Sequence, residues 1–253
     1  NGFYNGGAVD NAEIARIAQY SENVFFGKPC GLMDQVACAV GGIVAIDFAD
    51  PKAPVINKVD FDISAAGYNL CIVNTGGNHA DLTDDYASVP AEMKAVAKVL
   101  GADLLRRTDE AALMENIAKV REECGDRAVL RAMHFYNENV RVEKQSKALK
   151  AGDFEAFKAL VVESGFSSYM YNQNVYTCRA PENQPVSVAL AICQDVLNGK
   201  GAWRVHGGGF AGTIQAFVPE CALDEFKSRI CAAFGEKSCY VLNIRPVGGI
   251  KVI

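Results

Sequence analysis

The residues best suited to chemistry lie in one turn-forming segment, Gly27-Lys28-Pro29-Cys30-Gly31-Leu32-Met33-Asp34-Gln35. Gly27 and Pro29 end the helical pattern before them, and Gly31 lets the backbone approach a neighbouring group closely. Asp34 precedes a run of small apolar residues, which predicts a carboxylate near the start of a partly buried helix. There the helix dipole favours the ionised form, which can accept a proton or orient a hydroxyl group. The alternative is a helix N-cap or a solvated loop acid, because Asp is common at helix starts.

A second candidate is the glycine-rich run Gly207-Gly208-Gly209-Phe210-Ala211-Gly212, directly before the apolar residues 213–218. Residues without a Cβ adopt positive φ and present bare N–H groups, which can cradle an anionic oxygen. The run lacks the Lys-Ser/Thr tail of a P-loop and leads into a predicted strand rather than a helix. A tight loop at the start of a strand is therefore the alternative.

Composition indicates a globular protein and excludes several classes of partner. The chain has 253 residues, of which 50% are hydrophobic, enough for one large domain or two ordinary ones. Its 25 basic and 30 acidic residues are interspersed and give a net charge of −5, which disfavours nucleic acid and membrane partners. No segment approaches the ~20 apolar residues of a membrane span, and the first residues do not resemble a signal peptide. We therefore expect a cytoplasmic protein.

The cysteine and histidine content argues against a disulfide framework or a metal site. Nine cysteines are an odd number and include no Cys-x-x-Cys pair, so buried reduced thiols are expected. Only three histidines are present, His79, His134 and His206, and they are far apart in the sequence. We predict no metal site within the chain.

The hydrophobic patterns predict an α+β fold of mixed sheets with helices packed on them. A helix is expected at residues 9–20 and strands at 42–48, 55–62 and 68–74, after which long helical patterns dominate. Helices are expected at 80–100 (one, or two broken at Pro90), 110–122, 127–149, 153–166, 185–197 and 223–234, and strands after the glycine run, at 240–244 and at 249–253. The change of character predicts two domains, residues 1–79 and 80–253, the second with two layers.

Residues 15–23, 27–35 and 41–47 resemble the middle of the galactokinases, which are sugar kinases of the GHMP superfamily. The resemblance implies the GHMP kinase fold, with the end of the N-terminal domain followed by the C-terminal domain. In galactokinases the Cys-Gly-x-Met-Asp-Gln motif carries the aspartate that engages the anomeric hydroxyl of the sugar. Its match is Asp34, which the resemblance implies is catalytic, and the backbone of Gly31 is implied to contact the sugar.

Two further correspondences follow from the same resemblance. Gly207, Gly208, Gly209 and Gly212 match the third GHMP signature, which lies against the active site; the chain departs from the commonest form in having His206 before the triplet and Ala211 within the loop. Galactokinases also place a sugar-contacting tyrosine seven residues after a histidine, and Tyr86 stands at this distance from His79. The alternative for Tyr86 is an ordinary half-buried tyrosine on an amphipathic helix.

The resemblance implies ATP- and Mg2+-dependent phosphorylation of the C1 hydroxyl of α-D-galactose to galactose 1-phosphate. The N-terminal sugar signature and the Pro-x-x-x-Gly-x-x-Ser-Ser phosphate loop of galactokinases are not found in this sequence. We therefore expect a C-terminal portion of a larger kinase that is inactive by itself, and exposed strand edges suggest a homodimer.

Three alternatives stay open at the level of sequence. Residues 167–174 depart from the acidic pattern of galactokinases, so another GHMP sugar 1-kinase, such as one acting on N-acetylgalactosamine, is a competing hypothesis. The second is a non-catalytic galactose sensor. The third is a folding unit with no ligand site of its own.

Overall fold

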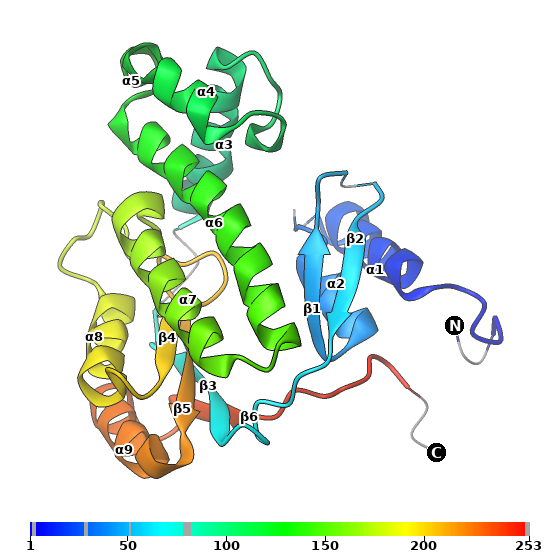
Figure 1. Cartoon of the computed structure of the whole chain (residues 1–253), viewed down its shortest axis with the longest axis vertical. Coiled ribbons are helices and arrows are strands. Elements are labelled where there is room, and N and C mark those ends of the chain that lie inside the picture. The colour runs from blue at the N-terminus through cyan, green and yellow to red at the C-terminus, as the bar shows by residue number, and fades with distance from the viewer. Residues whose placement is uncertain (2–3, 28–29, 51, 78–81, 251–253) are drawn as a thin grey trace. The chain divides into compact units, whose positions relative to one another are not determined.

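The structure is a computed structural model that describes residues 1, 4–27, 30–50, 52–77 and 82–250 (Figure 1). The chain forms two compact units, one of Asn1–Phe61 with Asn243–Ile253 and the other of Asp62–Leu242. The predicted domain boundary falls between residues 79 and 80, which lie outside the described residues. That division of the chain stays a prediction.

The first unit contains two helices, a short π-helix and a two-stranded sheet. They are α1 (Asn11–Tyr20), η1 (Ser21–Phe25), α2 (Met33–Val40), β1 (Ile43–Asp47) and β2 (Val55–Val59). Asp10 caps α1 by accepting a 2.8 Å hydrogen bond from the N–H of Glu13. The strands are antiparallel, with Ile43 opposite Val59, and the buried side chains of Ala15, Leu32 and Val36 form the core. The helix and both strands that the sequence predicted here are confirmed.

The C-terminal segment returns to this unit and packs against it through glycines. The Gly42 N–H donates to the Arg245 carbonyl at 2.7 Å. A Cβ on Gly41 would lie 2.1 Å from the Val247 carbonyl carbon, and one on Gly248 would lie 1.8 Å from the Ala39 oxygen. The strand predicted at 249–253 is wrong for Gly249 and Ile250, which are not in a strand, and its other residues lie outside the described part. Glycine gives a strand no side chain to pack, which explains the failure.

The second unit is built on a four-stranded antiparallel sheet in the order β4-β5-β3-β6. The strands are β3 (Tyr68–Asn74), β4 (Ala202–Val205), β5 (Thr213–Pro219) and β6 (Cys239–Leu242). The helices are α3 (Thr83–Val99), α4 (Glu110–Glu115), α5 (Ile117–Cys124), α6 (Asp126–Lys150), α7 (Phe154–Ser167), α8 (Pro185–Leu197) and α9 (Leu223–Phe234). Short turns of helix, η2 (Leu105–Arg107), η3 (Ser168–Asn172) and η4 (Glu220–Ala222), complete it.

Most of these elements match the predicted ones, and the differences have local causes. Helix α3 continues through Pro90, which lies on its exposed side. The predicted helix at 110–122 is two helices that meet at Asn116. Strand β4 was not predicted, because its four residues follow glycines and carry too short a pattern to identify.

Two apolar clusters stabilise this unit. The larger lies between the sheet and α8 and α9, and includes Cys193, Trp203, Ile214 and Phe226. The smaller lies between α3, α5 and α6, and includes Val96, Val120 and Ala132. Burying such side chains contributes about 1.5–3 kcal/mol each.

Helix α7 crosses β4 at a very short distance, which a glycine makes possible. A Cβ on Gly165 would lie 2.9 Å from the Trp203 carbonyl oxygen and 3.2 Å from the Cβ of Arg204. Any larger residue would force the helix away from the strand.

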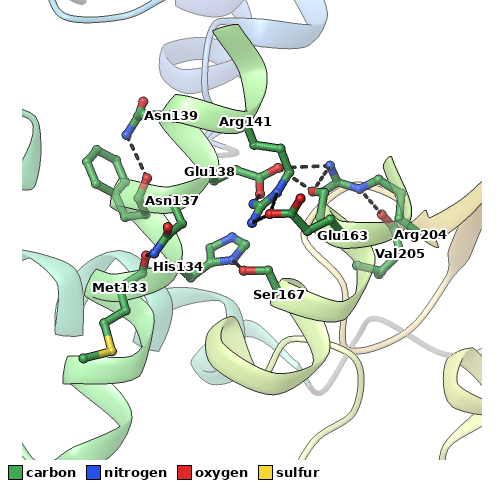
Figure 2. A network of polar contacts seen from close by, with 12 residues as sticks. Met133, His134, Asn137, Glu138, Asn139, Arg141, Glu163, Ser167, Arg204 and Val205 are labelled. Carbon is green, nitrogen blue, oxygen red and sulfur yellow. Dashed lines mark hydrogen bonds and ion pairs between the residues drawn. The ribbon is translucent and has the colours of Figure 1, made fainter. Parts of the chain in front are cut away.

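A partly buried network of charges fixes the same crossing and joins it to α6 (Figure 2). Glu138 on α6 pairs with Arg204 on β4 at 3.3 Å, and it also pairs with Arg141 and accepts from the Ser164 hydroxyl. Arg204 donates to the Ser164 hydroxyl oxygen at 2.7 Å. Burial opposes ionisation of Glu138, but the Ser164 hydroxyl and the two arginines outweigh it and hold the pKa of Glu138 below its usual value. The Glu138 carboxylate is therefore bonded by side chains from α6, α7 and β4.

His134 lies beside this network and stays neutral at pH 7. Its Nδ1 lies 2.9 Å from the Ser167 hydroxyl, and its side chain is buried. Burial lowers the pKa of His134 from 6.5 to about 4, with Arg204 and Arg141 acting in the same direction against the opposing charge of Glu138. A charged imidazole here would be costly.

The glycine crossing predicts that Gly165→Ala destabilises the protein, although Ala is the better helix former. We expect a loss of about 1–3 kcal/mol in the free energy of unfolding from the clash with Trp203 and Arg204. Urea denaturation measures this. Ala159→Gly, at an exposed position of the same helix, gives the helix-propensity contribution alone. A Gly165→Ala protein more stable than wild type would contradict the close approach.

The buried imidazole predicts a defined pH dependence of stability. The pKa of His134 is about 4 when folded and near 6.5 when unfolded, so the unfolded state binds the extra proton between these values. The contribution of the neutral His134 is therefore complete above pH 6.5 and is lost as pH falls to about 4. We expect His134→Gln to flatten the decrease in unfolding free energy over this range, by roughly 3 kcal/mol at most. Equal slopes in wild type and variant would refute the assignment.

Candidate functional site

Asp34 occupies the first turn of α2, and its side chain is exposed. The N-cap of this helix is Leu32, so the interpretation of Asp34 as an N-cap is wrong. Its carboxylate lies at the positive end of the helix dipole, where negative charge is stabilised. Gly31 is also exposed, and a Cβ there would meet nothing within 4 Å.

The residues around Asp34 hold its turn against α1 and η1. The Gln35 amide donates to Glu22 at 2.7 Å and to the Cys30 sulfur at 3.4 Å. The Cys30 N–H donates to the Asn23 side chain at 2.8 Å, and the Cys30 carbonyl accepts from Gln19 at 3.1 Å. Cys30 and Gln35 therefore position the backbone of the motif, and the side chain of Asp34 between them is exposed to solvent.

The second group of predicted residues lies in the other unit, where Tyr86 contacts the glycine loop, residues 207–212. The Tyr86 hydroxyl donates to the Gly209 carbonyl at 2.8 Å, and its ring packs edge-on against Phe210 with centroids 5.5 Å apart. A Cβ on Gly208 would lie 2.6 Å from the Tyr86 ring. Burial, followed by the charge of Asp85, raises the pKa of Tyr86, which keeps the phenol protonated. His79, from which its spacing was counted, lies outside the described residues.

The backbone of the glycine loop explains why glycine is needed there. Gly207, Gly209 and Gly212 have φ values of 71°, 84° and 86°, and Phe210 shares the left-handed region at 59°. A Cβ on Gly209 would lie 1.9 Å from the Asn174 carbonyl oxygen. Within the loop the Phe210 N–H donates to the Asn174 carbonyl at 2.5 Å and the Ala211 N–H donates to the Gly209 carbonyl at 2.7 Å.

The structure adds residues that sequence reasoning missed, because they act from distant segments. Asn174 accepts from the Phe210 N–H at 2.5 Å and donates through its side chain to the Gly208 carbonyl at 3.1 Å. Thr75, after β3, donates through both its N–H and its hydroxyl to the Gly212 carbonyl at 2.8 Å. The departure of residues 167–174 from the galactokinase pattern was the one available signal for Asn174.

A buried arginine supports the segment that carries Asn174. Arg131 is 1% exposed, donates to the Asn172 carbonyl at 3.1 Å and pairs with Glu92 at 2.8 Å. The side-chain oxygens of Asn172 and Asn174 are buried without a hydrogen-bond partner among the described residues. Such oxygens need a donor, which water or a ligand can supply.

Across the described part of the chain, no group of three or more His, Cys, Asp or Glu residues could hold a metal ion. An anion site at the glycine loop stays a prediction, and the described residues offer no cluster for Mg2+. The helices in the described ranges include none long and apolar enough to cross a membrane.

Comparisons with known proteins agree with these motifs. Residues 1–42 match the GHMP kinases N terminal domain. The galactokinase of Actinobacillus pleuropneumoniae serotype 3 is 31% identical over 226 residues, which are 89% of this chain and 56% of that protein. The galactokinase of Streptomyces coelicolor is 30% identical over 94% of this chain and 60% of its own length. The chain thus spans a little over half the length of these relatives.

Solved structures share the fold. The crystal structure of Lactococcus lactis galactokinase complexed with galactose superposes with a TM-score of 0.73 at 23% identity, over 97% of this chain and 62% of that one. The crystal structure of L. major mevalonate kinase in complex with R-mevalonate superposes with a TM-score of 0.59 at 16% identity, over 96% of this chain and 60% of that one. The resemblance that the motifs indicated is confirmed: this chain has the α+β fold of the GHMP kinases, and most of its sequence is similar to part of the galactokinases.

Proposed function

We propose that the full-length protein carrying this chain is a galactokinase, which transfers the terminal phosphoryl group of ATP to the C1 hydroxyl of α-D-galactose. The observation that carries the proposal is Asp34, exposed at the start of α2 within a Cys-Gly-x-Met-Asp-Gln motif. The galactokinases that match most of the chain support it. A cytoplasmic location and use of ATP with Mg2+ belong to the same proposal.

Phosphoryl transfer depends mainly on positioning and on stabilising charge. In the proposed reaction the Asp34 carboxylate accepts a hydrogen bond from the C1 hydroxyl, aligns its oxygen and takes up its proton as the bond to phosphorus forms. The ordered turn behind Asp34, held by Cys30 and Gln35, limits the motion of the carboxylate. Bound ATP would supply the phosphoryl group.

Tyr86 and the glycine loop are proposed to form the wall of a ligand site in the second unit. Tyr86 fixes Gly209 and Phe210, and Asn174 fixes the opposite side of the loop. These contacts keep the left-handed backbone of the loop in place without a ligand, so binding does not carry the entropic cost of ordering the loop. Tyr86 is also the proposed sugar contact, as the resemblance implies.

The first test is an assay of ATP consumption by the full-length protein with galactose, N-acetylgalactosamine and mevalonate. We expect turnover with galactose, and we expect Asp34→Asn to lower kcat by roughly 10²–10⁴-fold, because Asn cannot accept the proton. Asp60→Asn, a change at an exposed carboxylate, is the matched control and should leave the rate unchanged. Turnover with another substrate in the panel would identify a different GHMP kinase. Tight galactose binding without turnover would favour the sensor.

Tyr86→Phe tests the proposed wall, since it removes only the hydroxyl that bonds Gly209. We expect a several-fold higher KM for galactose and faster hydrogen exchange in residues 207–210, with a stability loss of about 1 kcal/mol. Tyr136→Phe is the control, because it removes a comparable hydrogen bond to Thr108, 2.6 Å long, in a different part of the unit. If both variants changed KM equally, a general loss of stability would explain the effect and Tyr86 would lose its assigned role.

A further inference from the structure

Three cysteine side chains gather in the sheet of the second unit, away from the residues assigned to catalysis. Cys71 lies on the central strand β3, Cys239 on β6 and Cys193 on α8, and all three belong to or pack against the same apolar cluster. Cys71 and Cys193 are fully buried, whereas Cys239 is half-buried. An oxidant from solvent therefore meets Cys239 first.

The strand register places Cys71 and Cys239 on one face of the sheet. Val73 is opposite Cys239, and Cys71 is opposite Val241, in the antiparallel pair of β3 and β6. Side chains two residues apart share a face, so Cys71 and Cys239 are diagonal neighbours. The two thiols are close enough for each to shift the pKa of the other.

The surroundings make Cys239 the more nucleophilic of the two thiols. The hydrogen bond from Cys71 lowers the pKa of Cys239, and the charge of Lys227 on α9 acts in the same direction against the effect of burial. The same interaction with Cys239, together with burial, raises the pKa of Cys71. A half-exposed thiolate next to a second thiol is the arrangement of oxidation-sensitive cysteine pairs.

We propose that Cys239 and Cys71 form an oxidisable dithiol, in which hydroperoxides modify Cys239 and Cys71 resolves the product as a disulfide. The proposal goes beyond the kinase function and does not depend on it. The Cys239 thiolate attacks one oxygen of hydrogen peroxide and the O–O bond breaks, which leaves a sulfenic acid on Cys239. The released hydroxide takes up a proton and becomes water. The sulfur of Cys71 then attacks the sulfenic acid, loses its proton and releases a second water. Two thiols are oxidised by two electrons, and the peroxide is reduced to two waters.

The position of β6 allows the bond to close. Diagonal neighbours are about 7–8 Å apart, whereas bonded cysteines have Cα atoms about 4.4–6.8 Å apart, so the strands must approach by about 1 Å. β6 lies at the edge of the described sheet, and Tyr240, Val241 and Leu242 are each at least 40% exposed. An edge strand with one partner can make this movement more easily than a central strand.

The proposal is tested by mass spectrometry. The purified chain is treated with hydrogen peroxide, its remaining thiols are blocked, and its peptides are mapped. We expect a Cys71–Cys239 crosslink with a mass lower by two hydrogens, reversed by dithiothreitol. In Cys71→Ala the reaction should stop at a sulfenic acid on Cys239 that dimedone captures. Cys231→Ala, which changes a half-buried thiol on α9, is the matched control and should form the crosslink as wild type does.

Peptide mapping of the wild-type protein decides the outcome even if Cys71→Ala folds poorly. Crosslinking of Cys239 to Cys193 would overturn the assignment of Cys71 as the resolving thiol. Oxidation of the exposed Cys38, Cys178 or Cys221 while Cys239 stays reduced would overturn the proposal as a whole. Neither result would bear on galactokinase activity, which the ATP assay measures separately.

Discussion

The second unit depends on the crossing of α7 over β4, where a glycine and a charge network meet. Gly165 permits the helix to touch the strand backbone, and the Glu138 carboxylate joins α6 to Arg204 on β4. Removing one member of such a network leaves a buried charge unpaired, which costs more than the intact network gains. The crossing therefore specifies one arrangement of α6, α7 and β4. Strand β4 ends directly before the glycine loop, so this arrangement also fixes where the loop begins.

The glycine loop is held by hydrogen bonds from three segments that are distant from it in the sequence. Thr75 follows β3, Tyr86 lies in α3 and Asn174 follows η3, and each bonds a different carbonyl or N–H of the loop. Its left-handed residues are unfavourable for most amino acids, so the conformation persists only because the surroundings determine it. Arg131 extends this support, because it ties the Asn172 carbonyl to Glu92 on α3.

In the first unit the Cys-Gly-x-Met-Asp-Gln motif separates the residues that hold the backbone from the exposed carboxylate of Asp34. Cys30 and Gln35 bond to α1 and η1, whereas Asp34 is exposed and makes no contribution to the core. An exposed carboxylate in the first turn of a helix lies at the positive end of the helix dipole, which suits the role proposed for Asp34. Stability and function are thus assigned to neighbouring side chains in one turn.

Local sequence patterns alone identified most helices and strands and the motif that carries Asp34. Local periodicity decides whether a segment is a helix or a strand, so α1, α8, α9 and β3 were predicted correctly. The Cys-Gly-x-Met-Asp-Gln motif is contiguous, so Asp34 could be identified from it. Short or glycine-bearing segments carried too little pattern, which explains why β4 was missed and why a strand was wrongly predicted at Gly249 and Ile250.

Only the tertiary structure decided which residues surround the glycine loop and which thiols meet. Asn174, Thr75 and Tyr86 are far from residues 207–212 in sequence, and no local pattern encodes their hydrogen bonds to the loop. The pairing of Cys71 with Cys239 likewise depends on the register of β3 and β6. Register and packing arise from the simultaneous burial of many side chains, and this is a property of the whole fold rather than of any single segment.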